Sequence, residues 1–279
     1  MTLADGDFMD LDWSFSKNAS RKVAVLLHGL EGNAKRNYIK GAGKVLTNAN
    51  WDVAAVNYRG CSGETNLLFS SYNAGKTDDL QAIMDFILNK DRYDEMVLIG
   101  FSLGGNLLLK YLGEWDFVPK ELKKAVAVSA PLSLKGSMES LDRFYNWVYR
   151  STFLKDLKQK YREKMVLFPE KMNVSELKNI KSLLDFDNAY TAPAHGFTDA
   201  LDYYEKNSSG QFLKNIKIPV LILNAENDSF LSAACYPKEL AANSKNLFLE
   251  VPKHGGHVGF HISNTLYYSE KRALGFIEE

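Results

Sequence analysis

The sequence predicts an α/β fold built on a mostly parallel, doubly wound sheet. Short runs rich in β-branched and apolar residues alternate with amphipathic stretches along most of the 279 residues. Two of these runs, 22–27 and 95–101, are apolar almost throughout, which is typical of strands covered on both faces. Strands that alternate with helices at this spacing indicate a parallel sheet with helices on both sides.

The predicted strands begin with one that alternates only partly between apolar and polar residues, which indicates an early antiparallel strand. The later strands are of the buried, parallel type. In chain order the predicted strands cover residues 8–15, 22–27, 52–57, 95–101, 124–129, 219–224 and 247–251.

The predicted helices lie between these strands and place apolar residues at helical spacing. In the stretch 77–89, for example, Leu80, Ile83, Met84 and Ile87 share one helix face. The helices expected to pack on the sheet cover residues 38–48, 77–89, 103–114, 197–206 and 263–278.

The alternation stops between about 132 and 195, where the pattern is helical throughout. We predict that this segment is a helical cap inserted into a single domain that spans residues 1–279. From Lys155 to Lys181 it holds eight Lys or Arg and four Asp or Glu. These basic side chains either form a solvated face or belong to a lid that shapes an acyl pocket and meets a lipid surface. Aromatic side chains cluster earlier in the segment, at Phe144, Tyr145, Trp147 and Tyr149.

Composition and charge exclude several classes of function. The 34 Lys and Arg balance the 34 Asp and Glu, so no overall field favours nucleic acid. No apolar run approaches the roughly 20 residues of a membrane span, and the acidic N-terminus lacks the pattern of a secretory signal. The two cysteines, Cys61 and Cys235, are far apart and fit neither a disulfide framework nor a zinc site. The sequence therefore predicts a cytoplasmic protein and leaves the oligomeric state open.

One short motif, Gly100-Phe101-Ser102-Leu103-Gly104, has the G-x-S-x-G pattern of a nucleophile elbow. A predicted strand leads into it and a predicted helix leads out, so the chain must turn sharply at Ser102. Glycines on both sides remove the side chains that would clash with that turn. The turn puts Ser102 at a helix N-terminus, where N–H groups and the helix dipole favour developing negative charge. Ser102 is therefore the predicted nucleophile.

A serine hydroxyl needs a base to take its proton. In folds with this turn, an acid and then a histidine follow the serine along the chain. His257 lies in the glycine-rich stretch 255–259, just after a predicted strand, and is the predicted base, with His254 as the alternative.

The acid is expected to follow a strand, where its carboxylate accepts the N–H of the histidine and fixes the tautomer. Asp228 lies just past the predicted strand 219–224 and is the predicted acid. Glu226, two residues earlier, is the alternative.

An acyl-transfer oxyanion needs two backbone N–H donors. Leu103, the residue after the nucleophile, is expected to supply one of them. The loop His28-Gly29-Leu30-Glu31-Gly32, which follows strand 22–27, is expected to supply the other, with Leu30 as the candidate. His28 itself is expected to be a structural hydrogen-bonding residue.

No metal or cofactor is predicted. Histidines 254, 257 and 261 have helical spacing, but Gly255 and Gly256 argue against a helix there, and no nearby Cys or acidic ligand completes a set. The stretch 41–44 lacks the first glycine and the Ser or Thr of a phosphate-binding loop. Cys61 lies in a loop and has no evident base, so a structural role is expected.

Several sequence blocks occur in order along almost the full chain. They are DGDF at 5–8, LDW at 11–13, HGLEG at 28–32, YRGCSGE at 58–64, GFSLGGN at 100–106, FD at 186–187, TAP at 191–193, GF at 196–197, DYY at 202–204 and GGHVGF at 255–260. Together they resemble the α/β-hydrolase superfamily, and more narrowly its YheT-like, embryogenesis-associated branch. The resemblance implies a triad on Ser102, Asp228 and His257 and esterase or lipase activity on acylglycerol-like or short-acyl esters. Ser229 departs from the proline usual after the acid.

We therefore interpret the chain as a serine hydrolase that cleaves small-molecule carboxylic esters, including acyl or lipid-like ones, through an acyl-enzyme. Two alternatives stay open. The same triad serves thioesterases, lactonases and amidases, and the fold also occurs in non-catalytic binding proteins.

Overall fold

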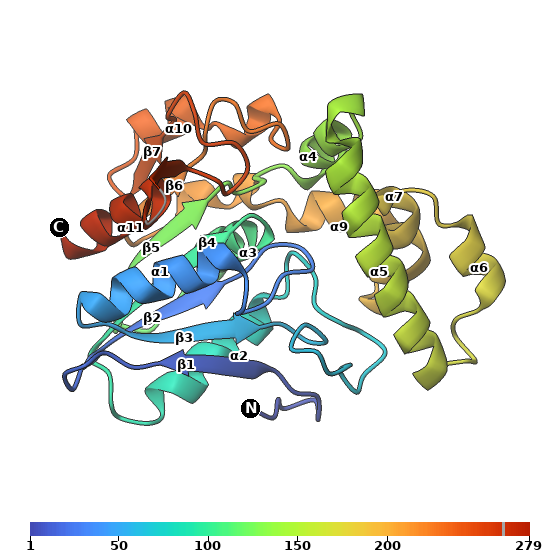
Figure 1. The fold of residues 1–279 in the computed structure, drawn as a ribbon, viewed down its shortest axis with the longest axis horizontal. Helices are drawn as coiled ribbons and strands as arrows, with labels where there is room; N and C mark the ends of the chain where they lie inside the picture. Colours follow the sequence, from blue (N-terminus) through green and yellow to red (C-terminus); the bar gives the residue numbers. More distant parts are fainter. Residues whose placement is uncertain (264–265) are drawn as a thin grey trace.

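A seven-stranded sheet forms the centre of the computed structural model, which describes residues 1–263 and 266–279 (Figure 1). Its strands are β1 (Asp10–Ser14), β2 (Lys22–Leu27), β3 (Asp52–Asn57), β4 (Glu95–Phe101), β5 (Leu122–Val128), β6 (Val220–Leu223) and β7 (Leu247–Glu250). They lie in the order β1-β3-β2-β4-β5-β6-β7. β1 pairs antiparallel with β3, and the other neighbouring strands pair in parallel. The predicted α/β fold with a mostly parallel sheet is confirmed.

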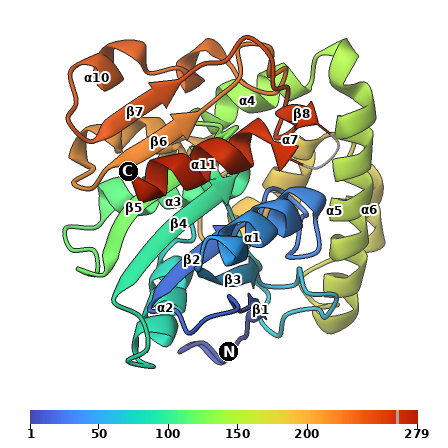
Figure 2. The ribbon, with the colours of Figure 1, turned by 60° about the vertical axis from the view of Figure 1, so that its left-hand side comes forward.

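Helices cover both faces of the sheet. α1 (Asn37–Asn48) and α11 (Tyr268–Glu278) lie side by side on one face (Figure 2). On the other face lie α2 (Thr77–Leu88) and α3 (Leu103–Glu114). Further along the chain are α9 (Ala200–Asn207), α10 (Lys238–Ala242) and short 3-10 turns at Ser209–Gln211, Leu213–Asn215 and Ala233–Cys235.

The period-two alternation of strand side chains builds two apolar layers. In β2, the side chains of Val23 and Val25 join the layer under α2 and α3, whereas Ala24 and Leu26 join the layer under α1 and α11. All four are fully buried. Burial of a Val or Leu side chain contributes about 1.5–3 kcal/mol, which explains why the central strands are apolar on both faces.

Between β5 and α9 the chain forms only helices and turns from Leu134 to Ala194, and we refer to this segment as the helical insertion. Its helices gather beside one end of the sheet (Figure 1) and share an apolar cluster that includes Leu157, Tyr161 and Phe186. The helices are α4 (Leu134–Leu141), α5 (Trp147–Leu167), α6 (Val174–Asn179), α7 (Leu183–Phe186) and α8 (Ala192–Ala194), with a 3-10 turn at Phe144–Asn146 and a π-helical turn at Asp187–Thr191.

Two predicted helix starts are wrong. The helix predicted from residue 197 begins at Ala200, because the Asp199 carboxylate caps it by accepting the N–H of Asp202 at 2.8 Å. The closing helix predicted from residue 263 begins at Tyr268. Before it, β8 (His261–Ser263) pairs antiparallel with β9 (Leu266–Tyr267), and the predicted helical residues 264–265 lie outside the described residues.

Candidate active site

The sharp turn predicted at Ser102 lies between the end of β4 and the start of α3. Ser102 has φ 51°, a left-handed conformation that is strained for a residue other than glycine. Its N–H donates to Val128 O at 2.8 Å, which ties the turn to β5. Gly104 allows the close approach of β2: a Cβ there would lie 2.5 Å from Leu27 O and 2.7 Å from His28 O. Local packing thus holds the strained turn in place.

His257 lies between Ser102 and Asp228, although the three residues come from distant parts of the chain. The His257 Nε2 atom is 2.9 Å from Ser102 Oγ, and its Nδ1 is 2.9 Å from Asp228 Oδ2. Asp228 is buried just beyond β6, and its Oδ1 also accepts the N–H of Phe230 at 3.0 Å. A carboxylate acceptor at Nδ1 favours the tautomer whose bare Nε2 faces the serine hydroxyl. The arrangement can move a proton from Ser102 to His257.

The two alternative residues are not part of this cluster. Glu226 and His254 are both exposed. Within the described residues, neither side chain makes a hydrogen bond to Ser102 or His257.

The loop after β2 lies directly against Ser102. A Cβ on Gly29 would be 3.1 Å from the Ser102 Cβ, so only glycine fits easily. His28 is fully buried, and burial lowers its pKa to about 3, which keeps the ring neutral. Its Nδ1 donates to Gly29 O at 2.7 Å, while its Nε2 accepts the N–H of Tyr58 at 3.4 Å. His28 therefore has the hydrogen-bonding position expected for it.

The His28 bond affects the direction of the Leu30 N–H. In a planar trans peptide, the C=O of Gly29 and the N–H of Leu30 point in opposite directions. Fixing the carbonyl at Gly29 therefore also fixes the Leu30 amide. Within the described part of the chain, the amides of Leu30 and Leu103 donate no hydrogen bond. Both residues line the same pocket as Ser102.

That pocket lies between the sheet and the helical insertion and encloses about 120 Å³. Most of its wall is apolar, and α4 and α5 contribute much of it. The apolar lining from the insertion includes Leu134, Met138, Leu141, Phe153, Leu157 and Phe186. An apolar pocket with a few convergent polar groups is the usual form of a small-molecule site.

A few polar side chains also line the pocket. Lys160 of α5 forms an ion pair with Glu31, Nζ to Oε1 at 2.8 Å. Asp187 accepts the hydroxyl hydrogen of Tyr204 at 2.6 Å. Burial raises the pKa of Asp187 to about 6, against the effect of the hydrogen bonds from Thr191 and Tyr204.

Two residues that position His257 were not among those predicted from the sequence. Asn227 Oδ1 accepts the N–H groups of Gly255 and Gly256 at 3.0 and 2.9 Å, which anchors the loop that carries the histidine. The ring of Phe230 stacks on the His257 ring with centroids 4.1 Å apart. Asn227 and Phe230 flank Asp228 closely in sequence, but only the fold places them against the histidine loop.

A solvated face was one of the two alternatives for the basic side chains of the insertion, and it is wrong for two of them. Lys160 and Lys164, one turn apart on α5, are 6% and 0% exposed. Both side chains point into the protein, where they contact loops that precede the insertion in sequence.

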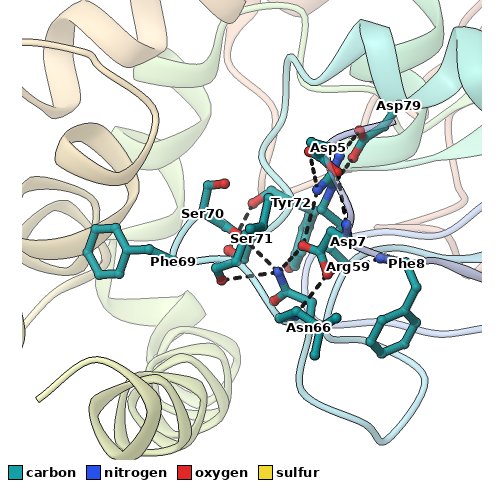
Figure 3. Close-up of polar contacts among 12 residues, drawn as sticks. Asp5, Asp7, Phe8, Arg59, Asn66, Phe69, Ser70, Ser71, Tyr72 and Asp79 are labelled. Atoms are coloured by element: carbon teal, nitrogen blue, oxygen red, sulfur yellow. Dashed lines mark hydrogen bonds and ion pairs between the residues drawn. The ribbon is translucent and has the colours of Figure 1, made fainter. Parts of the chain in front are cut away.

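Two of the sequence blocks, 5–8 and 58–64, meet in a buried ionic network beside the pocket (Figure 3). Arg59 forms ion pairs with Asp5, Asp7 and Asp79 at 2.7, 3.1 and 2.6 Å. The Asn66 side-chain amide donates to Asp7 Oδ2 at 2.6 Å. The network anchors the loop after β3, whose later residues 71–74 line the pocket.

Comparison with known proteins gives a consistent result. A family model described as alpha/beta hydrolase fold matches residues 23–263. The putative esterase YheT of Escherichia coli is 33% identical over 97% of this chain and 80% of its own. The phospholipase ABHD3 of Mus musculus is 32% identical over 92% of this chain, which spans only 64% of that protein. A solved esterase of Pyrococcus furiosus superposes over 99% of this chain and 88% of its own, with a TM-score of 0.63 at 19% identity.

Within residues 1–263 and 266–279, no helix combines the length and the apolar character that crossing a bilayer requires.

Proposed function

The chain belongs to the alpha/beta hydrolase fold family, in the YheT-like branch with its esterase- and lipase-like members, and on this basis we propose that it cleaves carboxylic esters through Ser102, His257 and Asp228. One observation carries the proposal. The 2.9 Å contact between His257 Nε2 and Ser102 Oγ, with Asp228 behind the ring, is the geometry that activates a serine.

In the proposed reaction, Ser102 Oγ attacks the acyl carbonyl while His257 Nε2 takes the hydroxyl proton. The Asp228 carboxylate steadies the imidazolium that forms. The N–H groups of Leu30 and Leu103 stabilise the oxyanion of the tetrahedral intermediate. When the intermediate collapses, His257 gives its proton to the leaving alkoxide, and Ser102 keeps the acyl group.

Water then hydrolyses the acyl-enzyme, with His257 again acting first as the base and then as the acid. His257 takes a proton from water, the resulting hydroxide attacks the acyl carbonyl, and the proton returns to Ser102 Oγ as the carboxylic acid leaves. The net reaction consumes one ester and one water and yields an alcohol and an acid.

We further propose that the pocket accepts the acyl chain and that the helical insertion acts as its cap. The apolar side chains of α4 and α5 support this substrate class, because they offer a hydrocarbon chain a water-free surface. The names of the two relatives, esterase and phospholipase, agree with an acyl ester substrate. The single-domain organisation and the cytoplasmic location stay predictions.

The test is hydrolysis of a series of p-nitrophenyl esters, from acetate to palmitate, by the purified protein, together with labelling by a fluorophosphonate probe. Ser102→Ala is expected to lower kcat by about 10⁴-fold or more, to abolish labelling and to leave the melting temperature near that of wild type. Ser175→Ala, on the exposed surface of α6, is the matched control and is expected to behave as wild type. Undiminished turnover by Ser102→Ala would refute the proposal, and turnover of thioesters or amides in preference to esters would correct its substrate class.

A further inference from the structure

A buried ion pair from the helical insertion holds the loop of residues 28–32, which follows β2 and which we call the oxyanion loop. Lys160 of α5 reaches across the pocket wall, and its Nζ lies 2.8 Å from Oε1 of Glu31. Glu31 directly follows Leu30, whose amide is one of the two proposed oxyanion donors. The side chains of the two charged residues are only 7% and 10% exposed, so the pair is largely shielded from water. A shielded pair is geometrically demanding and resists separation.

Glu31 needs such a restraint because its backbone is strained. Its φ of 49° is left-handed, a conformation that residues other than glycine rarely adopt. The N–H of Glu31 donates to the Tyr72 hydroxyl at 2.9 Å, and that hydroxyl in turn donates to Glu31 Oε1 at 2.6 Å. The Nζ of Lys160 also lies over the Tyr72 ring, 4.5 Å from its centroid, so Lys160, Glu31 and Tyr72 all contact one another. The conformation of the residue after Leu30 thus depends on a side chain from the insertion.

Within the described residues, Glu31 is the only carboxylate that forms an ion pair with Lys160. Its other polar contact is Cys61 Sγ at 3.4 Å, and burial raises the pKa of that thiol to about 11, which keeps it neutral at neutral pH. If α5 moves away, Lys160 is separated from Glu31, and the strained residue loses its ion pair and keeps only its contacts within the sheet domain, such as the hydrogen bonds with Tyr72. Seating of the insertion and the shape of the oxyanion loop are therefore linked.

We propose, on the basis of the proposed function, that Lys160 is a positioning residue for the oxyanion hole. Through Glu31 it holds the loop that presents the Leu30 amide to the substrate. The oxyanion hole is complete only when α5 is seated on the loop. Lys160 takes no part in proton transfer and acts on the transition state through the loop.

The structure supplies a matched control in Lys164, one turn further along the same helix. Lys164 is fully buried, as Lys160 nearly is, but its Nζ donates to the carbonyls of Asn66 (2.8 Å) and Leu68 in the loop after β3. It does not line the pocket. Removing Lys164 takes away bonds from α5 to the loop after β3 but leaves the Lys160–Glu31 pair, which holds α5 on the oxyanion loop, in place.

The test compares Lys160→Met, Lys160→Arg and Lys164→Met in hydrolysis of p-nitrophenyl butyrate, at a temperature where all three are folded by circular dichroism. Lys160→Met is expected to lower kcat about 10- to 100-fold with KM within about 3-fold of wild type, which is less than the roughly 10²- to 10³-fold loss on removal of a donor itself, because the Leu30 amide is displaced but still present. It is also expected to weaken binding of a trifluoromethyl ketone, whose serine adduct carries an oxyanion, by a similar factor. Lys160→Arg is expected to restore most of kcat, and Lys164→Met to leave kcat within about 3-fold of wild type.

A second variant covers the case in which the unpaired Glu31 carboxylate prevents folding of Lys160→Met. The double substitution Lys160→Met with Glu31→Gln removes both buried charges and is expected to be folded yet slow, with the same low kcat. A wild-type kcat in either variant would overturn the proposal. A rise in KM alone would also overturn it, because it would place Lys160 in direct contact with substrate. If the wild-type protein neither hydrolyses esters nor reacts with a fluorophosphonate, the proposed function fails, which is a separate outcome.

Discussion

Asn146 of the helical insertion and Ser229, the residue after Asp228, hydrogen-bond to each other in both directions. The Asn146 Nδ2 donates to Ser229 O at 2.9 Å, and Ser229 Oγ donates to Asn146 Oδ1 at 2.7 Å. The resemblance to the YheT-like branch implies a proline at the position of Ser229, and a proline would stiffen the turn by fixing φ. Here the side-chain pair restrains the same turn from outside, so the insertion also steadies the proposed catalytic acid.

Asn146→Ala is therefore expected to weaken both folding and turnover. Asn146 is buried, and its amide also donates to Ser140 O at 3.0 Å, so the substitution removes two hydrogen bonds from a buried amide and, within the described residues, leaves only Ser140 O with another donor, the N–H of Arg143. We expect the free energy of unfolding to fall by about 1–3 kcal/mol and kcat to fall several-fold. Urea denaturation and ester hydrolysis measure the two effects. Asn243→Ala, which removes an exposed amide, is expected to change neither, and an Asn146→Ala protein equal to it in both assays would contradict the prediction.

Gly104→Ala is expected to disturb the proposed oxyanion hole, because it changes the packing of α3 against the end of β2. The added Cβ would meet backbone atoms, Leu27 O and His28 O, so β2 and α3 must move apart. We expect a loss of about 1–3 kcal/mol in the free energy of unfolding and at least about a 10-fold lower kcat. Gly275→Ala in α11 is the control, because the nearest atom to its Cβ is Arg272 Nη1 at 3.6 Å. It is expected to stabilise the helix by up to about 1 kcal/mol with unchanged turnover. If Gly104→Ala and Gly275→Ala had the same free energy of unfolding and the same kcat, the packing at Gly104 would have room for a Cβ.

The sequence was sufficient to predict the sheet, and it also pointed to Ser102, His257 and Asp228, which the fold brings into contact, because these signals are local. A buried strand is apolar along its own length, and the elbow motif lies between a strand and a helix that are adjacent in sequence. Each predicted site residue lies at or shortly after the end of a parallel strand, and those ends meet at one edge of the sheet.

Residues whose role depends on contacts between distant segments could not be identified in this way. Lys160 and Lys164 lie in a lysine-rich helix, and nothing near them in sequence shows that both are buried. Their partners Glu31 and Asn66 are 129 and 98 residues away along the chain. The start of the closing helix was missed for a related reason, since β8 and β9 are too short to leave a period-two pattern.

An aromatic surface at the start of α5 gives a prediction about lipid. It consists of Phe144, Tyr145, Trp147, Val148 and Tyr149, each more than half exposed. The Tyr149 ring packs against Phe230 with centroids 5.0 Å apart, and Phe230 stacks on His257, so the surface adjoins the candidate site. Trp and Tyr side chains favour the interface between water and lipid. We therefore expect this surface to contact vesicles.

Sedimentation with vesicles of phosphatidylcholine and phosphatidylserine at low salt measures that contact. The double substitution Phe144→Ser and Trp147→Ser is expected to reduce retention about 10-fold, while hydrolysis of dissolved p-nitrophenyl butyrate stays unchanged. Phe117→Ser removes a side chain that is 87% exposed in the loop between α3 and β5, and it is expected to leave retention unchanged. If the vesicles do not retain the wild-type protein, or if they retain the double variant as well as Phe117→Ser, the aromatic surface has no role in lipid binding.

Asp187 is expected to make the protein less stable as the pH rises from 3.8 to about 6. Burial raises its pKa in the folded state to about 6 from an ordinary value of 3.8. Between these values the folded protein keeps a proton that the unfolded chain has lost, so the free energy of unfolding falls as pH rises. The loss is complete above about pH 6 and amounts to at most about 3 kcal/mol.

Asp187→Asn removes this titration, so its free energy of unfolding is expected not to fall in this way between pH 3.8 and about 6. The variant is therefore expected to be more stable than wild type at pH 7. Urea denaturation at pH 4, 5, 6 and 7 measures the difference between the two proteins, which cancels the contributions of the other titrating groups. Tyr204→Phe is the companion variant, because it removes the hydroxyl that donates to the Asp187 carboxylate at 2.6 Å and lowers its pKa. In that variant the free energy of unfolding is expected to keep falling up to a higher pH than in wild type. A difference between Asp187→Asn and wild type that stays constant from pH 4 to 7 would mean that the pKa of Asp187 is not raised by burial.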